Sequence, residues 1–368
     1  MAPPADYFQR YDLTEGDTIL DRSGDNVRED FMYSIYNIAP TQTPFMSGIG
    51  RGSSSDVYTS WQQDDLAAPD PTNAALDGAD IGADSSAKAR RVGNINQIST
   101  KSIITTGRAD VVDKAGRGSE LSYQLAKASK ALKRDMEAIL TGNQGAAAGD
   151  VNTNPSLLGG LRACFRDANA GTATGEAETT VTGANEGANG GTVPGTTYIP
   201  AAATDETTAL VALTETNLRT VIQGCYQNGG EPDTIMVSPT MKTVISTYLY
   251  TSSARVAALF SDVGQKRSDG GATAQGSIDV YISDFGALKI VPNRFQGHTG
   301  TAPRDRDVFV LDMSLWSTLY LRSFRTIKVA STGDSAKRLL LVDYSLCYKQ
   351  EMGSGGVFDV DATAPMTA

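Results

Sequence analysis

The sequence has little of several residue types on which enzyme sites and secreted proteins depend. It contains one histidine, His298, and three cysteines in 368 residues. One histidine cannot form a histidine-rich zinc site or a two-histidine metal motif. Cys164, Cys225 and Cys347 form no Cys-x-x-Cys pair, so the sequence favours reduced, buried thiols over a disulfide or a metal site.

An excess of positive charge and long apolar runs are also missing. The chain carries 32 Lys and Arg against 42 Asp and Glu, a formal net charge of −10 at pH 7. This balance argues against a protein that reads nucleic-acid sequence, because such proteins present a basic face. No stretch reaches the roughly 18 apolar residues of a membrane span, and the first residues lack the pattern of a secretory signal. We therefore expect a protein that is made in the cytosol and binds no membrane.

The short motifs that could carry chemistry are each incomplete. Gly48-Ile49-Gly50-Arg51-Gly52 lacks the buried strand and the following helix of a phosphate-binding loop, so a flexible bend is the simpler interpretation. Asp77, Asp80 and Asp84 miss the ligand spacing of a helix-loop-helix calcium site and suggest an acidic loop. His298 follows a loop pattern, where a lone histidine is usually solvated. We expect no catalytic residue, cofactor or metal, and no enzyme activity.

The N-terminal segment has apolar residues that follow neither a helical nor a strand period. Residues 1–35 are polar and acidic, and Pro40 and Pro44 each favour an extended backbone at the residue before them. Such a segment cannot bury enough of itself to fold alone, so we expect an arm that is disordered or ordered by packing on something else. Its apolar anchors are candidates for contacts between subunits: Ile38, Pro44, Phe45 and Met46.

Two strand-like segments flank a loop rich in Ala, Asp, Gly and Pro. Residues 57–61 alternate like a strand, and residues 94–106 are their expected partner across the loop 67–89. A two-stranded ribbon is marginally stable alone in water, so this one needs a neighbour to lie on. Trp61 is a further contact candidate, although packing is the simpler role for both Trp61 and Trp316.

Residues 119–141 are the best helix candidate. Ser119 is a suitable N-cap, Glu120 lies in the first turn, and Gly142 can end the helix. Apolar residues recur at steps of three and four and form one stripe: Leu121, Leu125, Ala128, Leu132, Met136, Ile139 and Leu140. At 1.5 Å per residue the helix would be roughly 33 Å long.

Three cations on this helix have two open interpretations. Lys127, Lys130 and Arg134 are predicted to share one helical face. They form either a solvated face opposite the apolar stripe or a basic stripe that meets an acidic partner or nucleic acid. All three are contact candidates.

Later residues alternate between helices and short strands around one insertion. Residues 171–208 contain 25 Ala, Gly or Thr in 38 positions and no Lys or Arg, which indicates low complexity. Thr214 can cap a helix that ends at Asn228-Gly229-Gly230, and Pro239 can open another. Strands dominate afterwards: 278–282 and 288–291 as a hairpin, then 308–311, 317–322, 326–330 and 338–348, before a loose tail at 353–356.

Charge is divided into two adjacent blocks of opposite sign. Residues 1–87 carry 15 Asp and Glu and 4 Lys and Arg, a net charge of −11. Residues 88–134 carry 11 Lys and Arg and 3 Asp and Glu, a net charge of +8. Such blocks suggest complementary surfaces that guide association between copies of the chain.

Five blocks together resemble a known family. The most specific is Tyr36-Asn37-Ile38-Ala39-Pro40-Thr41-Gln42-Thr43-Pro44-Phe45-Met46-Ser47, and the others are Trp61-Gln62-Gln63-Asp64, Asn96-Gln97-Ile98, Leu132-Lys133-Arg134-Asp135-Met136-Glu137 and Gly229-Gly230-Glu231-Pro232-Asp233-Thr234-Ile235. In this order they resemble the major capsid proteins of tailed bacteriophages with the Hong Kong 97-type fold. The likeness is closest to the head-protein family that includes the phage SU-ten type, and it spans residues 30–350 except the insertion.

The resemblance implies an α+β fold with a defined layout. An N-terminal arm would occupy residues 1–60, an extended E-loop 61–110, and a peripheral domain with a long spine helix 111–150. An axial domain would occupy 151–275 and include the insertion 171–208, and residues 276–368 would complete both domains and end in a flexible tail. A lysine–asparagine cross-linking pair cannot be matched in this sequence, so covalent cross-linking is not expected.

The function that the resemblance implies is a self-assembling shell. We expect hexamers and pentamers of this chain that enclose packaged double-stranded DNA in a virion, after assembly in the host cytoplasm. Expected partners are a portal and a separate scaffolding protein, because no long N-terminal scaffolding domain is recognised, and a decoration protein is a further candidate. The alternative is a structural protein of a phage tail or fibre, for which a repeat or coiled coil would be typical but is not found.

Overall fold

The computed structural model describes most of the chain from residue 39 onward. The described residues are 39–64, 66, 69–74, 77–78, 89–112, 114, 118–150, 153–165, 199–200, 202, 210, 212–251, 278–296, 305–331 and 333–366. The predictions that concern Ile38, His298 and the insertion 171–208, apart from residues 199, 200 and 202, lie outside this part of the chain.

The fold combines helices with three sheets. The helices and 3-10 turns are α1 (Pro44–Gly48), α2 (Gly107–Val111), α3 (Glu120–Leu140), η1 (Arg162–Cys164), α4 (Glu215–Gln227), α5 (Pro239–Thr251), η2 (Met313–Leu315) and η3 (Glu351–Gly353). The strands are β1 (Gly50–Ser53), β2 (Tyr58–Gln63), β3 (Arg90–Ile95), β4 (Gln97–Thr106), β5 (Thr234–Val237), β6 (Val280–Ser283), β7 (Gly286–Pro292), β8 (Val308–Leu311), β9 (Trp316–Val329), β10 (Ser335–Tyr348) and β11 (Gly355–Val357).

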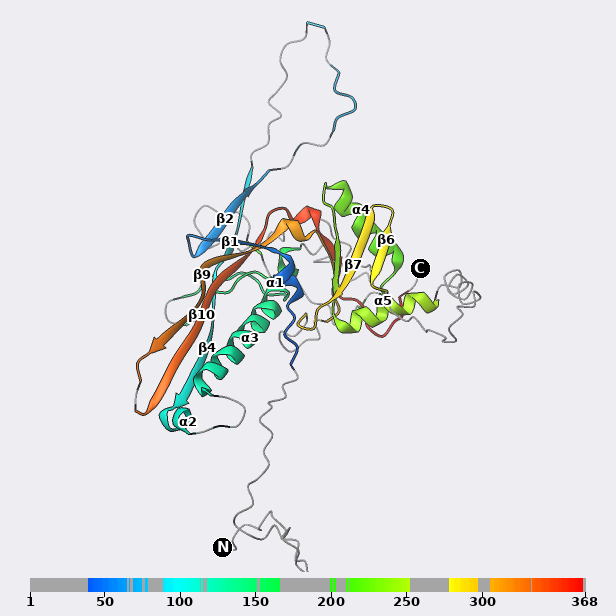
Figure 1. Cartoon of the computed structure of the whole chain (residues 1–368). Coiled ribbons are helices and arrows are strands. Elements are labelled where there is room, and N and C mark those ends of the chain that lie inside the picture. The colour runs from blue at the N-terminus through cyan, green and yellow to red at the C-terminus, as the bar shows by residue number, and fades with distance from the viewer. Residues whose placement is uncertain are drawn as a thin grey trace, which may run out of the picture.

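An elongated half of the molecule is built from α3 and a four-stranded sheet of order β1-β9-β10-β4. The three long strands pair antiparallel, and β1 pairs parallel with β9. Helix α3 lies along one face of this sheet (Figure 1). Ser119 caps the helix by accepting a hydrogen bond from the amide of Ser122, as the sequence predicts. The long helix is therefore confirmed to within one residue at each end.

A second half is built on a five-stranded sheet of order β11-β8-β5-β7-β6, with α4 and α5 packed on it (Figure 1). Thr214 accepts a hydrogen bond from the amide of Asn217 and starts α4, and Gly229 ends this helix with a φ of 82°. Pro239 opens α5. Both helices and the β6–β7 hairpin were predicted from these capping and turn residues, and all three are confirmed.

The described residues form two hydrophobic cores, and one of them contains residues from both halves of the molecule. Strands β5 and β8 of the five-stranded sheet are buried on both faces. Met236, Phe309 and Leu311 face the core beneath α3. Their neighbours Ile235 and Val310 face a second core that includes α4 and α5. Because successive side chains of a strand point to opposite faces of the sheet, the five-stranded sheet lies between the two cores and contributes side chains to both.

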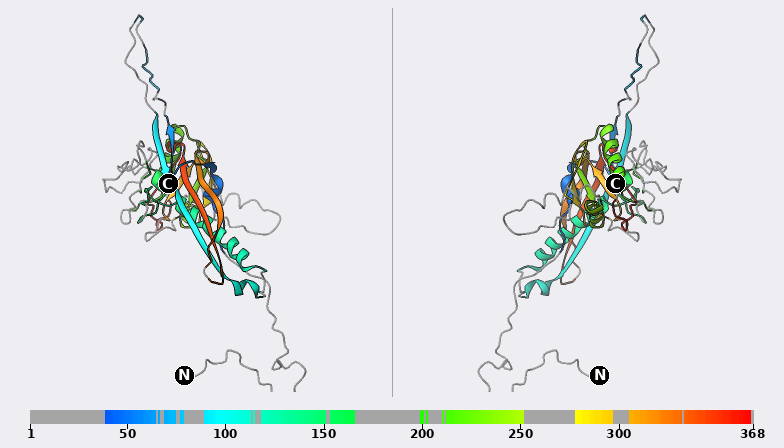
Figure 2. Two further views of the ribbon diagram at one scale, coloured as in Figure 1. Left: turned by 90° about the vertical axis from the view of Figure 1, so that its left-hand side faces the viewer. Right: turned by 90° about the vertical axis from the view of Figure 1, so that its right-hand side faces the viewer.

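A ribbon of β2 and β3 projects beyond the end of the four-stranded sheet (Figures 1 and 2). The sequence predicted one strand at 94–106 opposite 57–61, and that pairing is wrong for its second part. Strand β3 pairs with β2, whereas β4 pairs with β10. The chain passes from ribbon to sheet at Asn96, whose side-chain amide donates to the carbonyl of Asp56 at 2.6 Å.

Two further predictions need correction. Residues 317–322 and 326–330 were predicted as separate strands, but β9 is continuous because β10 pairs along its whole length, with an irregular register where Asp343 is followed by Tyr344. The segment 353–356 was predicted as a loose tail. Instead β11 is buried and pairs with β8, and Gly356 allows this approach because a Cβ there would lie 2.8 Å from the carbonyl oxygen of Val308.

Candidate assembly surfaces

The segment before β1 is fixed to the body of the molecule by a buried carboxylate. Glu137 on α3 is fully buried. Its two carboxylate oxygens accept hydrogen bonds from the backbone amides of Phe45 and Met46, both at 2.8 Å. The side-chain amide of Asn293, just after β7, donates to the same carboxylate at 2.8 Å. Glu137 therefore joins α1, α3 and the end of a strand of the five-stranded sheet.

Phe45 and Met46 are consequently wrong as candidates for contacts between subunits. Their side chains are 0% and 4% exposed and belong to the core that Trp316 and Met136 share. The sequence pattern suggested an arm because a helix of five residues leaves no periodic signal. Pro44, the first residue of α1, is half-buried, and its contact role stays a prediction.

Burial dominates the electrostatics of Glu137. Removal from water raises the pKa of this carboxyl above its ordinary value of 4.5, and this effect outweighs the hydrogen bonds from Met46, Phe45 and Asn293, which lower it. The folded chain therefore binds the Glu137 proton more tightly than the unfolded chain does.

The stability advantage of the wild-type chain over Glu137→Gln should depend on pH. The contribution of the raised pKa is fully present below about pH 4.5 and is lost as the pH rises through the folded pKa of Glu137. The glutamine variant has no proton to lose at this position. Urea unfolding of both chains between about pH 4.5 and pH 8 should give a difference that shrinks toward alkaline pH. A difference that grows toward pH 8 contradicts the raised pKa.

The ribbon is anchored in the core at its base. The Trp61 ring packs edge-on against Tyr348, with 5.0 Å between the ring centroids. The side-chain amide of Gln63 donates to the carbonyl of Lys349 at 3.0 Å, and that of Asn94 donates to the carbonyl of Leu346 at 2.8 Å. These contacts confirm a packing role for Trp61. Part of its surface stays exposed, so its subunit-contact role remains a prediction.

The three cations of α3 do not share one environment. Lys127 and Lys130 are exposed, as expected for a solvated face. Arg134 is half-buried, and its guanidinium lies over the Phe295 ring at 5.2 Å from the centroid. The spacing of the three residues in α3 is as predicted, but the interpretation of a solvated face does not hold for Arg134, because Phe295, just after β7, covers its guanidinium. The contact role of Arg134 stays a prediction. The contact roles of Lys127 and Lys130 remain predictions.

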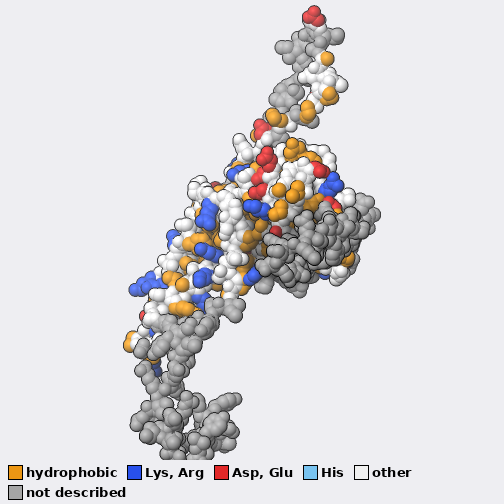
Figure 3. Space-filling view, turned by 45° about the vertical axis from the view of Figure 1, so that its right-hand side comes forward, with side chains coloured by type: hydrophobic (Ala, Val, Ile, Leu, Met, Phe, Trp, Pro, Cys, Tyr) orange, Lys and Arg blue, Asp and Glu red, His pale blue; other side chains and the backbone are white. Residues whose placement is uncertain are grey.

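The face of the four-stranded sheet opposite α3 exposes apolar side chains. Ile98, Ile104 and Val329 are 52%, 65% and 41% exposed. The register places Lys337 between Ile104 and Val329, and Arg325 lies on the same face. The register thus makes this face apolar and basic. On the side of the molecule that Figure 3 shows, Lys and Arg side chains also lie over the elongated half, and acidic side chains lie along the ribbon and its base.

A cluster of metal-ligating side chains is absent from the part of the chain that the structure describes. There, no three side chains of the His, Cys, Asp and Glu types gather closely enough to hold a metal ion. Cys164, Cys225 and Cys347 are free thiols and buried, as the sequence predicts. None of the described helices is both long and apolar enough to cross a membrane.

Several of these anchoring residues were not singled out from the sequence. Glu137 has a visible signal, since a carboxylate three residues before Leu140 interrupts the apolar side of α3, and charged residues are rarely buried without partners. Asn94 and Asn293 have no comparable signal. Their partners are distant in the chain, for example the 252 residues between Asn94 and Leu346.

Solved capsid structures share this fold. The capsid of a native GTA particle aligns with a TM-score of 0.56 at 10% identity, over 94% of this chain and 100% of that chain. The capsid of Cyanophage A-1(L) aligns with a TM-score of 0.54 at 13% identity, over 91% of this chain and 97% of that chain. The chain therefore has the fold of the subunits in these capsid structures.

Sequence comparison then gives the family. The chain belongs to the SU10 major capsid protein family, whose model matches residues 10–361. It is 27% identical over 344 residues to the major capsid protein of Escherichia phage Phieco32, covering 87% of this chain and 91% of that protein. Its function is to form the capsid shell of a phage, and it is located in the virion. This result confirms the resemblance found from the sequence. The alternative, a structural protein of a phage tail or fibre, is not supported.

Proposed function

We propose that the chain builds its shell with the Hong Kong 97-type arrangement, as hexamers and pentamers that close into an icosahedral head around double-stranded DNA. In this proposal the four-stranded sheet with α3 is the peripheral domain, the five-stranded sheet with α4 and α5 is the axial domain, and the β2–β3 ribbon is the base of the E-loop. The arm consists of the residues before Pro44, because α1 lies in the core and β1 pairs with β9. The insertion 171–208 belongs to the axial domain.

The ribbon of one copy then lies on the uncovered sheet face of another. Residues 64–87 contain six Asp and no Lys or Arg. The opposite surface offers Arg325 and Lys337 beside the exposed Ile98, Ile104 and Val329. Opposite charge guides the encounter and fixes its register, and burial of the apolar side chains stabilises it. Because ribbon and sheet face are different surfaces, the contact is head-to-tail and generates rings.

The ribbon is the observation that carries this proposal, and removal of residues 64–89, which connect its two strands, is the test. Gln63 and Arg90 are paired across the ribbon, so residues 64–89 can be replaced by a two-residue Asn-Gly turn without changing the register. We expect the variant to fold with an unchanged circular dichroism spectrum and to form no closed shells in negative-stain electron microscopy. Closed shells of normal size from this variant would overturn the role that we propose for residues 64–89 in the contact between copies.

A second replacement serves as the control. Residues 171–198 are exchanged for a short Gly-Ser linker, which removes a similar length of chain. Because this segment is rich in Ala, Gly and Thr, it offers little apolar area to bury at about 25 cal/mol per Å². We expect shells from this variant.

A portal, a separate scaffolding protein, a decoration protein and the packaged DNA remain proposed partners.

A further inference from the structure

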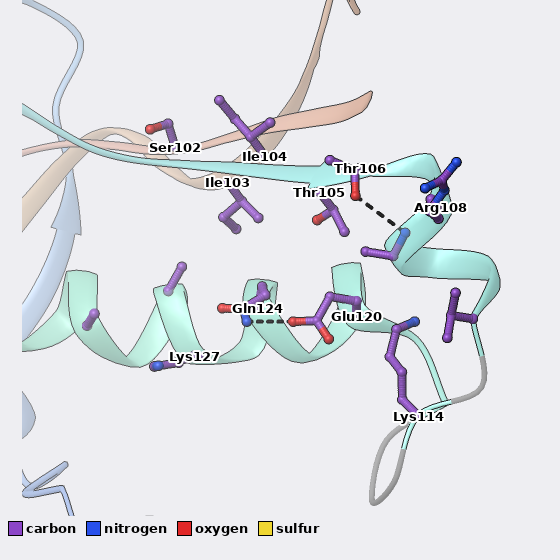
Figure 4. A pocket seen from close by; sticks show the side chains of 14 residues that line it. Ser102, Ile103, Ile104, Thr105, Thr106, Arg108, Lys114, Glu120, Gln124 and Lys127 are labelled. Atoms are coloured by element: carbon purple, nitrogen blue, oxygen red, sulfur yellow. Dashed lines mark hydrogen bonds between the residues drawn. The ribbon is translucent and has the colours of Figure 1, made fainter. Parts of the chain in front are cut away.

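A groove of about 970 Å³ lies between β4, α2 and the first half of α3 (Figure 4). The fully buried residues of α3 all lie in its second half: Leu132, Met136, Glu137 and Leu140. Before Leu132 the small side chains of Ala128 and Ala131 face the groove. Ile103 points from β4 toward the helix, and α2 closes one end. The sheet and the helix therefore leave a space that no described residue fills.

The groove combines an apolar lining with a cationic rim. Arg108, Lys114 and Lys127 line it together with one acid, Glu120, which accepts a hydrogen bond from the side-chain amide of Gln124 at 2.7 Å. The ammonium nitrogen of Lys114 is buried and has no hydrogen-bond partner among the described residues. A buried ammonium group without an acceptor is costly, so this rim favours a partner that brings carboxylates.

The N-terminal residues of the chain are acidic and aromatic, which suits a groove with an apolar lining and a cationic rim. Residues 1–38 carry eight Asp and Glu against three Arg, a net charge of −5. They also contain six aromatic residues: Tyr7, Phe8, Tyr11, Phe31, Tyr33 and Tyr36. The acidic segment 64–87 has no aromatic residue, so it is the poorer match to an apolar groove.

The segment also starts within reach of the groove. Ala39 precedes α1, whose first amides are held by Glu137 on α3. Gln124 lies 13 residues before Glu137 on the same helix, a distance of about 20 Å. About six extended residues span this distance, which leaves some 30 residues to occupy the groove. Tethering at this range gives an effective concentration on the order of millimolar, which a separate copy in dilute solution cannot match.

We propose that residues 1–38 bind in this groove of their own chain, with aromatic side chains against Ile103 and Ala128 and carboxylates beside Lys114 and Lys127. The contact orders the N-terminal segment and covers the first half of α3. It is independent of how the shell is arranged, because it forms within one subunit.

Hydrogen exchange on the unassembled subunit tests the proposal. The full chain is compared with a chain that begins at Ala39, which keeps every residue of both cores, since the first of these is Phe45. We expect the amides of residues 121–131 to lose protection in the shorter chain and to regain it when a synthetic peptide of residues 1–38 is added. Equal protection in the two chains overturns the proposal. Protection of the full chain that disappears on dilution assigns the groove to a second copy and overturns binding within one chain.

Charge reversal on α3 supplies a matched pair of variants. Lys127→Glu reverses a cation on the rim, whereas Lys133→Glu reverses an exposed cation of the same helix that does not line the groove. In the chain that begins at Ala39, Lys127→Glu should weaken binding of the labelled peptide at least about tenfold, and Lys133→Glu should change it less than about twofold. If both changes weaken peptide binding equally, the peptide responds to the overall charge of the chain and not to the groove, and the assignment to the groove is overturned. Shell formation is scored separately by electron microscopy. Failure of the proposed contact between copies can therefore be distinguished from failure of N-terminal binding in the groove.

Discussion

Replacing Glu137 with alanine should lower the free energy of unfolding by about 3–5 kcal/mol, because the change leaves several buried donors without an acceptor. The amides of Phe45 and Met46 and the side chain of Asn293 all donate to this carboxylate. Each buried donor left without an acceptor costs about 1–3 kcal/mol. Loss of the contact also frees α1, so Phe45 loses its position in the core. Urea unfolding monitored by tryptophan fluorescence measures the effect, since Trp316 lies 6.3 Å from Phe45 between ring centroids.

Asp135→Asn is the matched control, because it also removes one carboxylate charge from α3. Asp135 is 44% exposed and forms an ion pair with Lys101. Exposed pairs of this kind contribute about 0–1 kcal/mol. If Glu137→Ala unfolds at the same urea concentration as Asp135→Asn, the buried carboxylate does not hold α1 in place.

Arg162→Met should also destabilise the folded chain by about 3–5 kcal/mol, because it leaves two acids near each other without their cation. The Arg162 side chain is 1% exposed. Its guanidinium lies 3.1 Å from an Asp359 oxygen and 3.8 Å from an Asp307 oxygen, and it covers the Phe358 ring at 3.8 Å from the centroid. The cluster connects η1 with the start of β8 and with the residues after β11. Thermal unfolding of the purified subunit is the measurement.

An exposed ion pair in the same protein provides the control for the Arg162→Met variant. Arg219 and Asp284 approach to 2.9 Å, but their side chains are 58% and 72% exposed. Arg219→Met should therefore change stability by less than about 1 kcal/mol. Equal effects at Arg162 and Arg219 would mean that the buried cluster contributes no more than a surface pair.

Elements defined by neighbouring residues were predictable from the sequence. The limits of α3 and α4 follow from Ser119 and Thr214, whose hydroxyl groups accept hydrogen bonds three residues further along the chain. The β6–β7 hairpin has its turn residues in one short segment. In each case the information lies within a few residues, where propensity and capping act.

Long-range pairing was not predictable in the same way. Strand β4 pairs with β10 more than 200 residues later, so the pattern of β4 alone could not exclude β2 as its partner. For Phe45, the sequence marks an apolar side chain that must be buried, but not whether its own chain or a neighbour buries it. The hydrogen bond from Phe45 to Glu137, 92 residues away, decides this question in the folded chain.

The passage from ribbon to sheet at Asn96 has a mechanical consequence. Strands β3 and β4 run nearly in line, and β4 is paired with β10 from Gln97 to Thr106 (Figure 2). The backbone hydrogen bonds of an antiparallel pair are perpendicular to the strands. A pull on the ribbon along this line therefore loads many of these bonds at once in shear and does not peel them apart one by one. Tension that reaches the ribbon is thus borne by the pairing of β4 with β10.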